Sequence, residues 1–261
     1  CLNNELSLTT GSRAFLPQYV GVRGERVPPV HSLLAELMLE TNLSGVSDSN
    51  DLVTLGRTGV TDDFSVLRGQ VSYSFFLEPL LNPAGFEGRK SRDEMTLAHE
   101  VWLSARGQTT FGERVVPNFQ QTAGGFYTVR GYDESLAVGD DVIIATAEYR
   151  FHLGRALPEG AELDSLFGRP FRSRRSQPYG SADWDVVLRA FIDAAATHNN
   201  KKPSFERNET LVGAGVGIAG RLKNNLSARV DVGWALQDAG PMTNRTEAGD
   251  LRVHFVSSFT F

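Results

Sequence analysis

Several segments in the second half of the chain alternate apolar and polar residues with a period of two, which is the spacing of a β-strand. These segments are residues 143–153, 186–195, 226–236 and 251–261. In the third segment, Leu226, Val230 and Trp234 share one face, while Arg229 and Asp231 share the other. If the apolar face is turned outward, the charged face needs a wet interior. The pattern therefore predicts an all-β protein, an antiparallel transmembrane β-barrel with lipid outside and a polar lumen inside.

The lengths of these segments and the aromatic residues at their ends favour the same prediction. Each segment is about 10 to 12 residues long, and a tilted strand needs roughly 9–11 residues to cross a bilayer. Tyr149, Trp234, Phe259 and Phe261 lie near segment ends, where membrane barrels carry girdles of aromatic residues. A half-exposed sheet in a soluble β-sandwich, acting as a binding module, is the alternative that this pattern leaves open.

The first half of the chain adds further predicted strands, which brings the total to nine or ten. The clear strands are residues 67–77 and 97–105, and the weaker candidates are residues 2–10 and 15–22. Residues 33–41 consist of strong helix formers and also fit a helix, but the neighbouring strands favour a strand. A long connection covers residues 107–139, and connections of this length are usually functional or disordered. We predict a single barrel domain over residues 1–261.

Composition narrows the classes of protein that this chain can represent. The net charge of −5 argues against sequence-independent nucleic-acid binding, so no nucleic-acid partner is expected. No run approaches 18 apolar residues, so the sequence predicts no transmembrane helix. Cys1 is the only cysteine, which precludes a disulfide within the chain.

No motif points to catalysis, a metal or a cofactor. The histidines lack metal-ligand spacing, and no serine has the context of a nucleophile elbow. Residues 215–220 match Gly-x-Gly-x-x-Gly, but a polar turn at residues 223–225 follows where a dinucleotide fold would place a helix. Asp140 and Asp141 are adjacent and would face opposite ways on a strand, so we interpret them as turn residues. We expect a protein that is not an enzyme and that uses no cofactor and no metal.

Five motifs follow one another between residues 95 and 261. They are Phe126-Tyr127-Thr128-Val129-Arg130-Gly131-Tyr132, Phe191-Ile192-Asp193, Gly213-Ala214-Gly215-Val216-Gly217, residues 225–236 and the terminal Phe259-Thr260-Phe261. In this order they resemble the C-terminal barrel of the outer-membrane assembly and secretion superfamily. The spacing is closest to the haemolysin activator/secretion type, the translocators of two-partner secretion. The resemblance covers residues 95–261 and implies a location in the lipid bilayer of a bacterial outer membrane.

The resemblance also implies a site inside the barrel, because in this family the long loop folds back into the lumen. Its arginine there meets acidic side chains of the barrel wall. The matching loop residues are Val129, Arg130, Gly131 and Tyr132, and the acidic residues on faces assigned inward are Glu148, Asp193 and Asp231. We expect Arg130 to lock the loop, since a planar guanidinium suits a bidentate carboxylate partner.

A row of glycines fits the same interpretation. Gly213, Gly215 and Gly217 share one face of their strand. Glycines that face the lumen leave room for an inserted loop to approach the strand backbone. We therefore expect these three residues to lie opposite the loop.

The function implied by the resemblance is a protein translocation pore that conducts an unfolded secreted polypeptide and is gated by residues 129–132. An assembly factor that inserts membrane-protein β-barrels is the alternative within the superfamily. Phe255, Phe259 and Phe261 give the C-terminal strand the aromatic character that the barrel assembly machinery recognises. We expect this last strand to pair with the first and close the barrel, because an open edge is costly in lipid.

Overall fold

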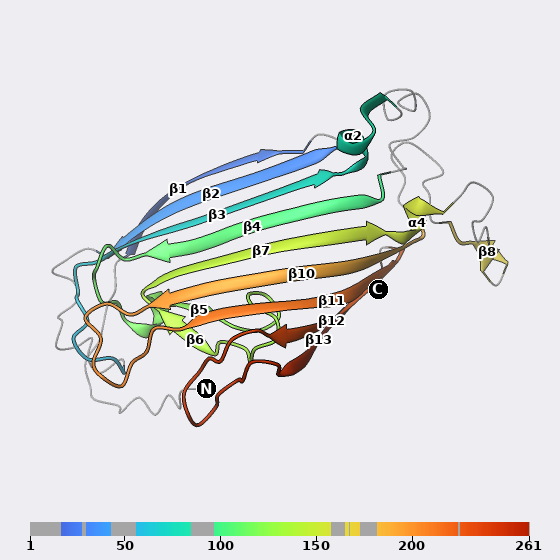
Figure 1. Ribbon diagram of the computed structural model, residues 1–261. Helices are drawn as coiled ribbons and strands as arrows, with labels where there is room; N and C mark the ends of the chain where they lie inside the picture. The colour runs from blue at the N-terminus through green and yellow to red at the C-terminus, as the bar shows by residue number, and fades with distance from the viewer. Residues whose placement is uncertain are drawn as a thin grey trace.

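The computed structural model describes residues 17–27, 30–42, 56–84, 97–157, 165–166, 168–172, 182–223 and 225–260. Nine of the strands form one antiparallel sheet, in the order β1-β2-β3-β4-β7-β10-β11-β12-β13. These strands are β1 (Pro17–Arg26), β2 (His31–Asn42), β3 (Ser65–Phe76), β4 (His99–Thr109), β7 (Asp141–His152), β10 (Trp184–His198), β11 (Thr210–Leu222), β12 (Leu226–Ala235) and β13 (Leu251–Phe259). Figure 1 shows the long strands lying side by side in a curved sheet.

The two faces of the sheet differ in chemistry as the alternating pattern predicts. The outer face exposes large apolar side chains along successive strands, among them Leu37, Tyr73, Ile143, Ile192, Val216 and Phe255. The inner face buries charged side chains, including Glu148, Asp193 and Asp231. The prediction of an all-β, antiparallel architecture is confirmed, and residues 33–41 belong to strand β2 rather than to a helix.

Residues 110–140, which connect β4 to β7, lie against the inner face. They contain the short 3-10 helix η2 (Pro117–Phe119) and a two-stranded sheet of β5 (Gln121–Ala123) and β6 (Ala137–Gly139). This small sheet contacts β7 and β10 (Figure 1). The sequence predicted that the connection begins at Gly107, but β4 continues to Thr109 because Gly107 and Gln108 still pair with β7. We call residues 110–140 the inner loop.

A hydrophobic core forms where the inner loop meets the sheet. Val129 and Tyr132 from the inner loop are fully buried against Ile144, Leu211 and Ala235 from three strands. Burial of apolar area of this kind stabilises by about 25 cal/mol per Å². The inner loop therefore behaves as a packed part of the fold.

The remaining elements are short and lie beyond the end of the sheet that is farther from β5 and β6 (Figure 1). They are α2 (Glu78–Leu81), α4 (Leu153–Ala156), β8 (Ser165–Leu166) and β9 (Arg169–Pro170). None of the described helices is long or apolar enough to span a membrane. Residues 2–10, predicted as a possible strand, lie outside the described residues.

The sheet is open, which corrects the expectation that the last strand pairs with the first. Among the described residues, β13 pairs with β12 and β1 pairs with β2, so these two strands form the edges. A closed barrel of eight or nine strands has an interior that its own side chains fill. Here the inner face holds the inner loop, and the described strands leave the sheet open between β1 and β13.

Candidate functional site

Arg130 lies at the centre of a buried ion-pair cluster on the inner face. Its Nε and Nη2 atoms donate to the two carboxylate oxygens of Asp193 at 2.7 and 2.8 Å, and its backbone N–H donates to the same carboxylate at 3.1 Å. Nη1 donates to Glu148 and to Asp231, each at 3.0 Å. All four residues are almost completely buried. Arg130 therefore ties the inner loop to strands β7, β10 and β12.

The strand register explains why these three carboxylates converge. Glu148 on β7 stands opposite Phe191 on β10, and Asp193 follows two residues later on the same face. Asp231 on β12 stands opposite Gly217 on β11, a residue without a side chain. The Arg130 guanidinium carbon lies 3.3 Å from the centre of the Phe191 ring. The aromatic face supports the cation while the carboxylates surround it.

Three further arginines complete the cluster. Arg189 donates to Glu148 through Nε at 2.8 Å and lies 3.4 Å from Asp231. Arg150 donates to Glu148 at 2.6 Å, and Arg229 donates to Asp231 at 2.9 Å. The sequence places these arginines on the polar faces of their strands, but we did not assign them to the site. A recognisable signal exists, since each stands two or four residues from an acidic residue on the same strand and face.

Tyr132 anchors the inner loop a second time. Its buried hydroxyl lies 2.9 and 2.8 Å from the carbonyl oxygens of Val212 and Gln237. The N–H groups of the same two residues donate to it at 3.2 Å. One hydroxyl thus joins the inner loop to the ends of β11 and β12, where the strands leave the sheet.

Substitution of Tyr132 by phenylalanine is expected to lower the free energy of unfolding by about 1–3 kcal/mol, because it leaves buried polar groups without a partner. The matched control is Tyr127→Phe. Tyr127 is 71% exposed, so removal of its hydroxyl leaves no buried polar group without a partner. Urea unfolding in detergent measures both variants. Equal losses in the two variants would show that the Tyr132 hydroxyl has no special role.

Glycines let the inner loop approach the strands. A Cβ atom on Gly213 would lie 2.0 Å from the carbonyl oxygen of Arg130, and one on Gly233 would lie 2.6 Å from the Gly131 nitrogen. Gly131 itself has a φ of 100°, which favours glycine. Gly215 and Gly217 lie on the same face, against Phe191 and Asp231. Gly233 and Gly131 extend the predicted row of three glycines, and the role of Gly233 was not recognised from the sequence.

Thus the structure brings together Val129, Arg130, Gly131, Tyr132, Glu148, Asp193, Asp231, Gly213, Gly215 and Gly217. It does not test their role in gating, which stays a prediction. Phe255 and Phe259 are exposed on the outer face of β13, and Phe261 lies outside the described residues. In the described part of the chain, no group of three or more His, Cys, Asp or Glu residues is arranged to hold a metal ion.

Asp141 begins strand β7, which corrects its interpretation as a turn residue, whereas Asp140 lies in the bend before that strand, as predicted. Asp140 also has a tertiary role that the sequence analysis did not identify. It is fully buried and forms a bidentate ion pair with Arg57, which comes from a different connection. A local pattern of two adjacent acidic residues could not reveal this, because the partner lies 83 positions earlier in the chain.

Comparison with solved structures shows that the fold resembles part of the fold of CdiB. CdiB from Escherichia coli superposes with a TM-score of 0.61 and 16% sequence identity, covering 94% of this chain and 37% of that protein. CdiB from Acinetobacter baumannii gives a TM-score of 0.55 and 16% identity, covering 93% of this chain and 33% of that protein. This chain therefore spans about a third of the length of either structure. No family model and no curated protein matches the sequence.

Proposed function

We propose that this chain is the barrel part of an outer-membrane pore that translocates an unfolded polypeptide, as in two-partner secretion. The proposal rests above all on the Arg130 cluster, which seats a loop inside a concave polar face. Residues Val129–Tyr132 are the gate: they occupy the lumen at rest and move when polypeptide passes. The fold shared with the two CdiB structures supports a transporter of this type.

The chemistry of the two faces supports a role in a membrane. The exposed apolar outer face suits lipid, while the backbone groups of the central strands are satisfied by their neighbours, as a membrane requires. The inner face beside the inner loop has a cavity whose lining includes the polar side chains of Glu36, Arg68, Gln70 and Arg106. Such a surface can exchange hydrogen bonds with an extended polypeptide without binding it tightly.

Ion pairs around a loop suit gating better than catalysis. Each guanidinium in the cluster faces carboxylates, and these carboxylates are held as hydrogen-bond acceptors. With these ion pairs formed the inner loop is seated against the strands, and with them broken it is released. The balance between these two states controls whether polypeptide can pass through the lumen. The pore thus needs no chemical step of its own.

An assembly factor that inserts membrane-protein β-barrels is the second candidate. In the described part of the chain β1 and β13 are the edges of the sheet, which favours it, because an unpaired strand edge can template another strand. The two candidates differ in client: a secreted polypeptide passes the inner face, whereas a nascent barrel strand pairs with an edge.

Site-specific photocrosslinking tests the proposal with two adjacent positions. A photoreactive phenylalanine replaces Gln70, on the inner face, or Val71, which is exposed on the outer face. We expect position 70 to crosslink a secreted polypeptide in outer membranes, because alternate residues of a strand face opposite sides. Position 71 should crosslink lipid only.

Equal capture of polypeptide at both positions, or at neither, would contradict translocation through the lumen. Capture of outer-membrane barrel proteins by a probe on β1 or β13, with none at position 70, would instead support the assembly factor.

A further inference from the structure

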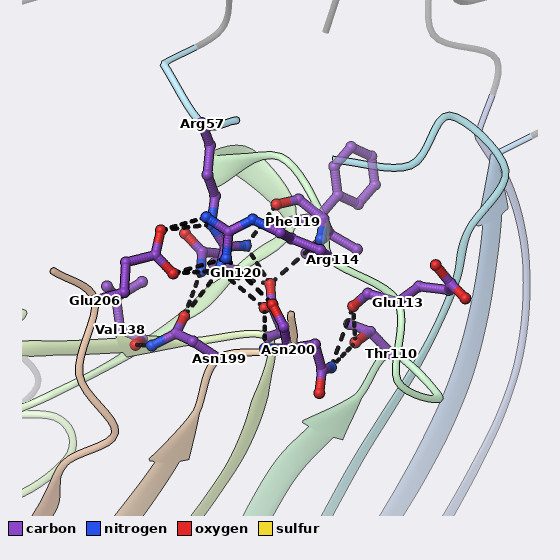
Figure 2. Close-up of polar contacts among 12 residues, drawn as sticks. Arg57, Thr110, Glu113, Arg114, Phe119, Gln120, Val138, Asn199, Asn200 and Glu206 are labelled. Atoms are coloured by element: carbon purple, nitrogen blue, oxygen red, sulfur yellow. Dashed lines mark hydrogen bonds and ion pairs between the residues drawn. The ribbon is translucent and has the colours of Figure 1, made fainter. Parts of the chain in front are cut away.

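A second buried ion-pair cluster lies at the end of the sheet where β4 leaves and β7 begins. Three connections contribute to it: residues 43–64 between β2 and β3, the inner loop, and residues 199–209 between β10 and β11. We call its members the loop latch. They are Arg57, Arg114, Asp140, Asn199, Asn200 and Glu206. In Figure 2 the side chains of Arg57, Arg114 and Glu206 point toward one another above Asn199 and Asn200.

Asp140 forms the buried base of the loop latch. Arg57 donates to both of its carboxylate oxygens, with Nη2 at 2.9 Å, and the backbone N–H of Asn200 donates at 2.8 Å. The backbone N–H of Val115 donates to Asp140 at 3.3 Å, and the Arg57 guanidinium donates to the Val115 carbonyl oxygen at 2.7 Å. One carboxylate thus holds all three connections together.

Glu206 closes the loop latch from the other side of the arginines. Arg114 donates to it through Nη1 at 2.7 Å, and Arg57 donates to it through Nη2 at 3.1 Å. Burial opposes ionisation of Glu206, but the hydrogen bonds from Arg114 and Arg57 outweigh it and lower the pKa of Glu206 from 4.5 to about 2. Glu206 therefore stays charged throughout the neutral and mildly acidic range.

The asparagines and backbone groups fill the remaining hydrogen-bonding positions. Asn199 accepts from Arg57 at 2.9 Å and donates to the carbonyl oxygen of Val138 at 3.0 Å. Arg114 donates to the carbonyl oxygens of Thr58 and Asn200 at 2.7 and 3.2 Å. The side chains of Arg57, Arg114 and Asp140 are at most 5% exposed. Buried and fully bonded groups of this kind are not the loosely held ion pairs of a protein surface.

The loop latch holds the inner loop at both of its roots. Arg114 lies five residues after the end of β4, and Asp140 is the last residue before β7. Arg130 and Tyr132, which seat the middle of the inner loop, lie between these two points. The inner loop cannot swing away from the sheet as a unit while both roots remain tied to Arg57 and Glu206.

We propose that the loop latch is a second lock on the pore, which positions the inner loop and closes the mouth of the lumen at this end. This inference rests on the proposed function. The end of the sheet opposite the loop latch carries the long connections 77–98 and 153–183, but it also has the two shortest connections, residues 27–30 and 223–225. Barrels place their short turns on the periplasmic side. On this assignment the loop latch closes the exit side, and polypeptide leaves only after it opens.

Single-channel conductance of the protein in planar lipid bilayers tests the second lock. The variant Asp140→Asn removes the charge that pairs with Arg57, and we expect the time spent in open states to rise by about tenfold, the effect of losing one charge-assisted hydrogen bond. Glu206→Gln is the companion variant at the rim of the cluster. The matched control is Glu113→Gln, because Glu113 and Lys201 join two of the same connections through an exposed ion pair.

The outcomes separate the second lock from the proposed function. If either Asp140→Asn or Glu206→Gln inserts in the bilayer and gates like the unchanged protein, the proposal that the loop latch is a second lock is overturned. If Asp140→Asn does not insert, Glu206→Gln decides. Gating altered equally by Glu113→Gln also overturns it, since loop tethering in general would then explain the effect. A longer open time in the two latch variants, but not in Glu113→Gln, supports the second lock. If the probe at position 70 captures no polypeptide, that result counts against translocation and leaves the second lock supported.

Discussion

Replacement of Arg130 by alanine is expected to lower the free energy of unfolding by about 3–5 kcal/mol, the usual cost of removing one partner from a buried ion pair. Asp193 would lose its bidentate partner, and its carboxylate is fully buried. Glu148 and Asp231 would keep Arg189, so the damage should centre on the contact between the inner loop and β10. Urea unfolding in detergent measures the loss, and hydrogen exchange of residues 126–132 locates it.

Two variants make this prediction specific. Arg130→Lys retains the charge but loses the planar fork, so it should recover only part of the stability. Arg245→Ala is the control, since its ion pair with Asp238 is about half exposed and exposed ion pairs contribute little to stability. If Arg130→Ala unfolds at the same urea concentration as Arg245→Ala, the Arg130 cluster does not hold the inner loop in place.

Substitution of Gly213 by alanine should displace the inner loop without removing any charge. The added Cβ would lie 2.0 Å from the carbonyl oxygen of Arg130, which is backbone and cannot rotate away. Overpacking of this kind costs typically about 1–3 kcal/mol, and here the cheapest relief is to move the inner loop off β11. We expect faster proteolysis within residues 110–140 and a larger open fraction in conductance recordings.

Gly220 supplies a matched control on the same strand. A Cβ atom there would meet nothing within 4 Å, so Gly220→Ala should leave stability and loop protection unchanged. Similar behaviour of the two alanine variants would mean that strand flexibility, and not contact with the inner loop, explains the glycine at position 213.

The two clusters were not equally accessible to prediction from the sequence. Asp193 and Asp231 stand out because period-two alternation assigns each of them to a polar face, and the family resemblance supplies Arg130 as their partner. Asp140 has no such support. Its neighbours suggest a turn, and its partner Arg57 belongs to a connection in which no local pattern indicates a buried charge.

The alternation of side chains by itself determined the strands, the apolar outer face, the charged inner face and the inward direction of the glycines, because the period of a β-strand is a local property. The tertiary structure alone decided that, among the described residues, β1 and β13 do not pair with each other. It also decided that four arginines share three carboxylates, and that Arg57, Arg114 and Glu206 meet over Asp140. These features depend on sheet curvature and on which connections share one end of the sheet. Such contacts join residues as many as 149 positions apart, and no short window of sequence encodes them.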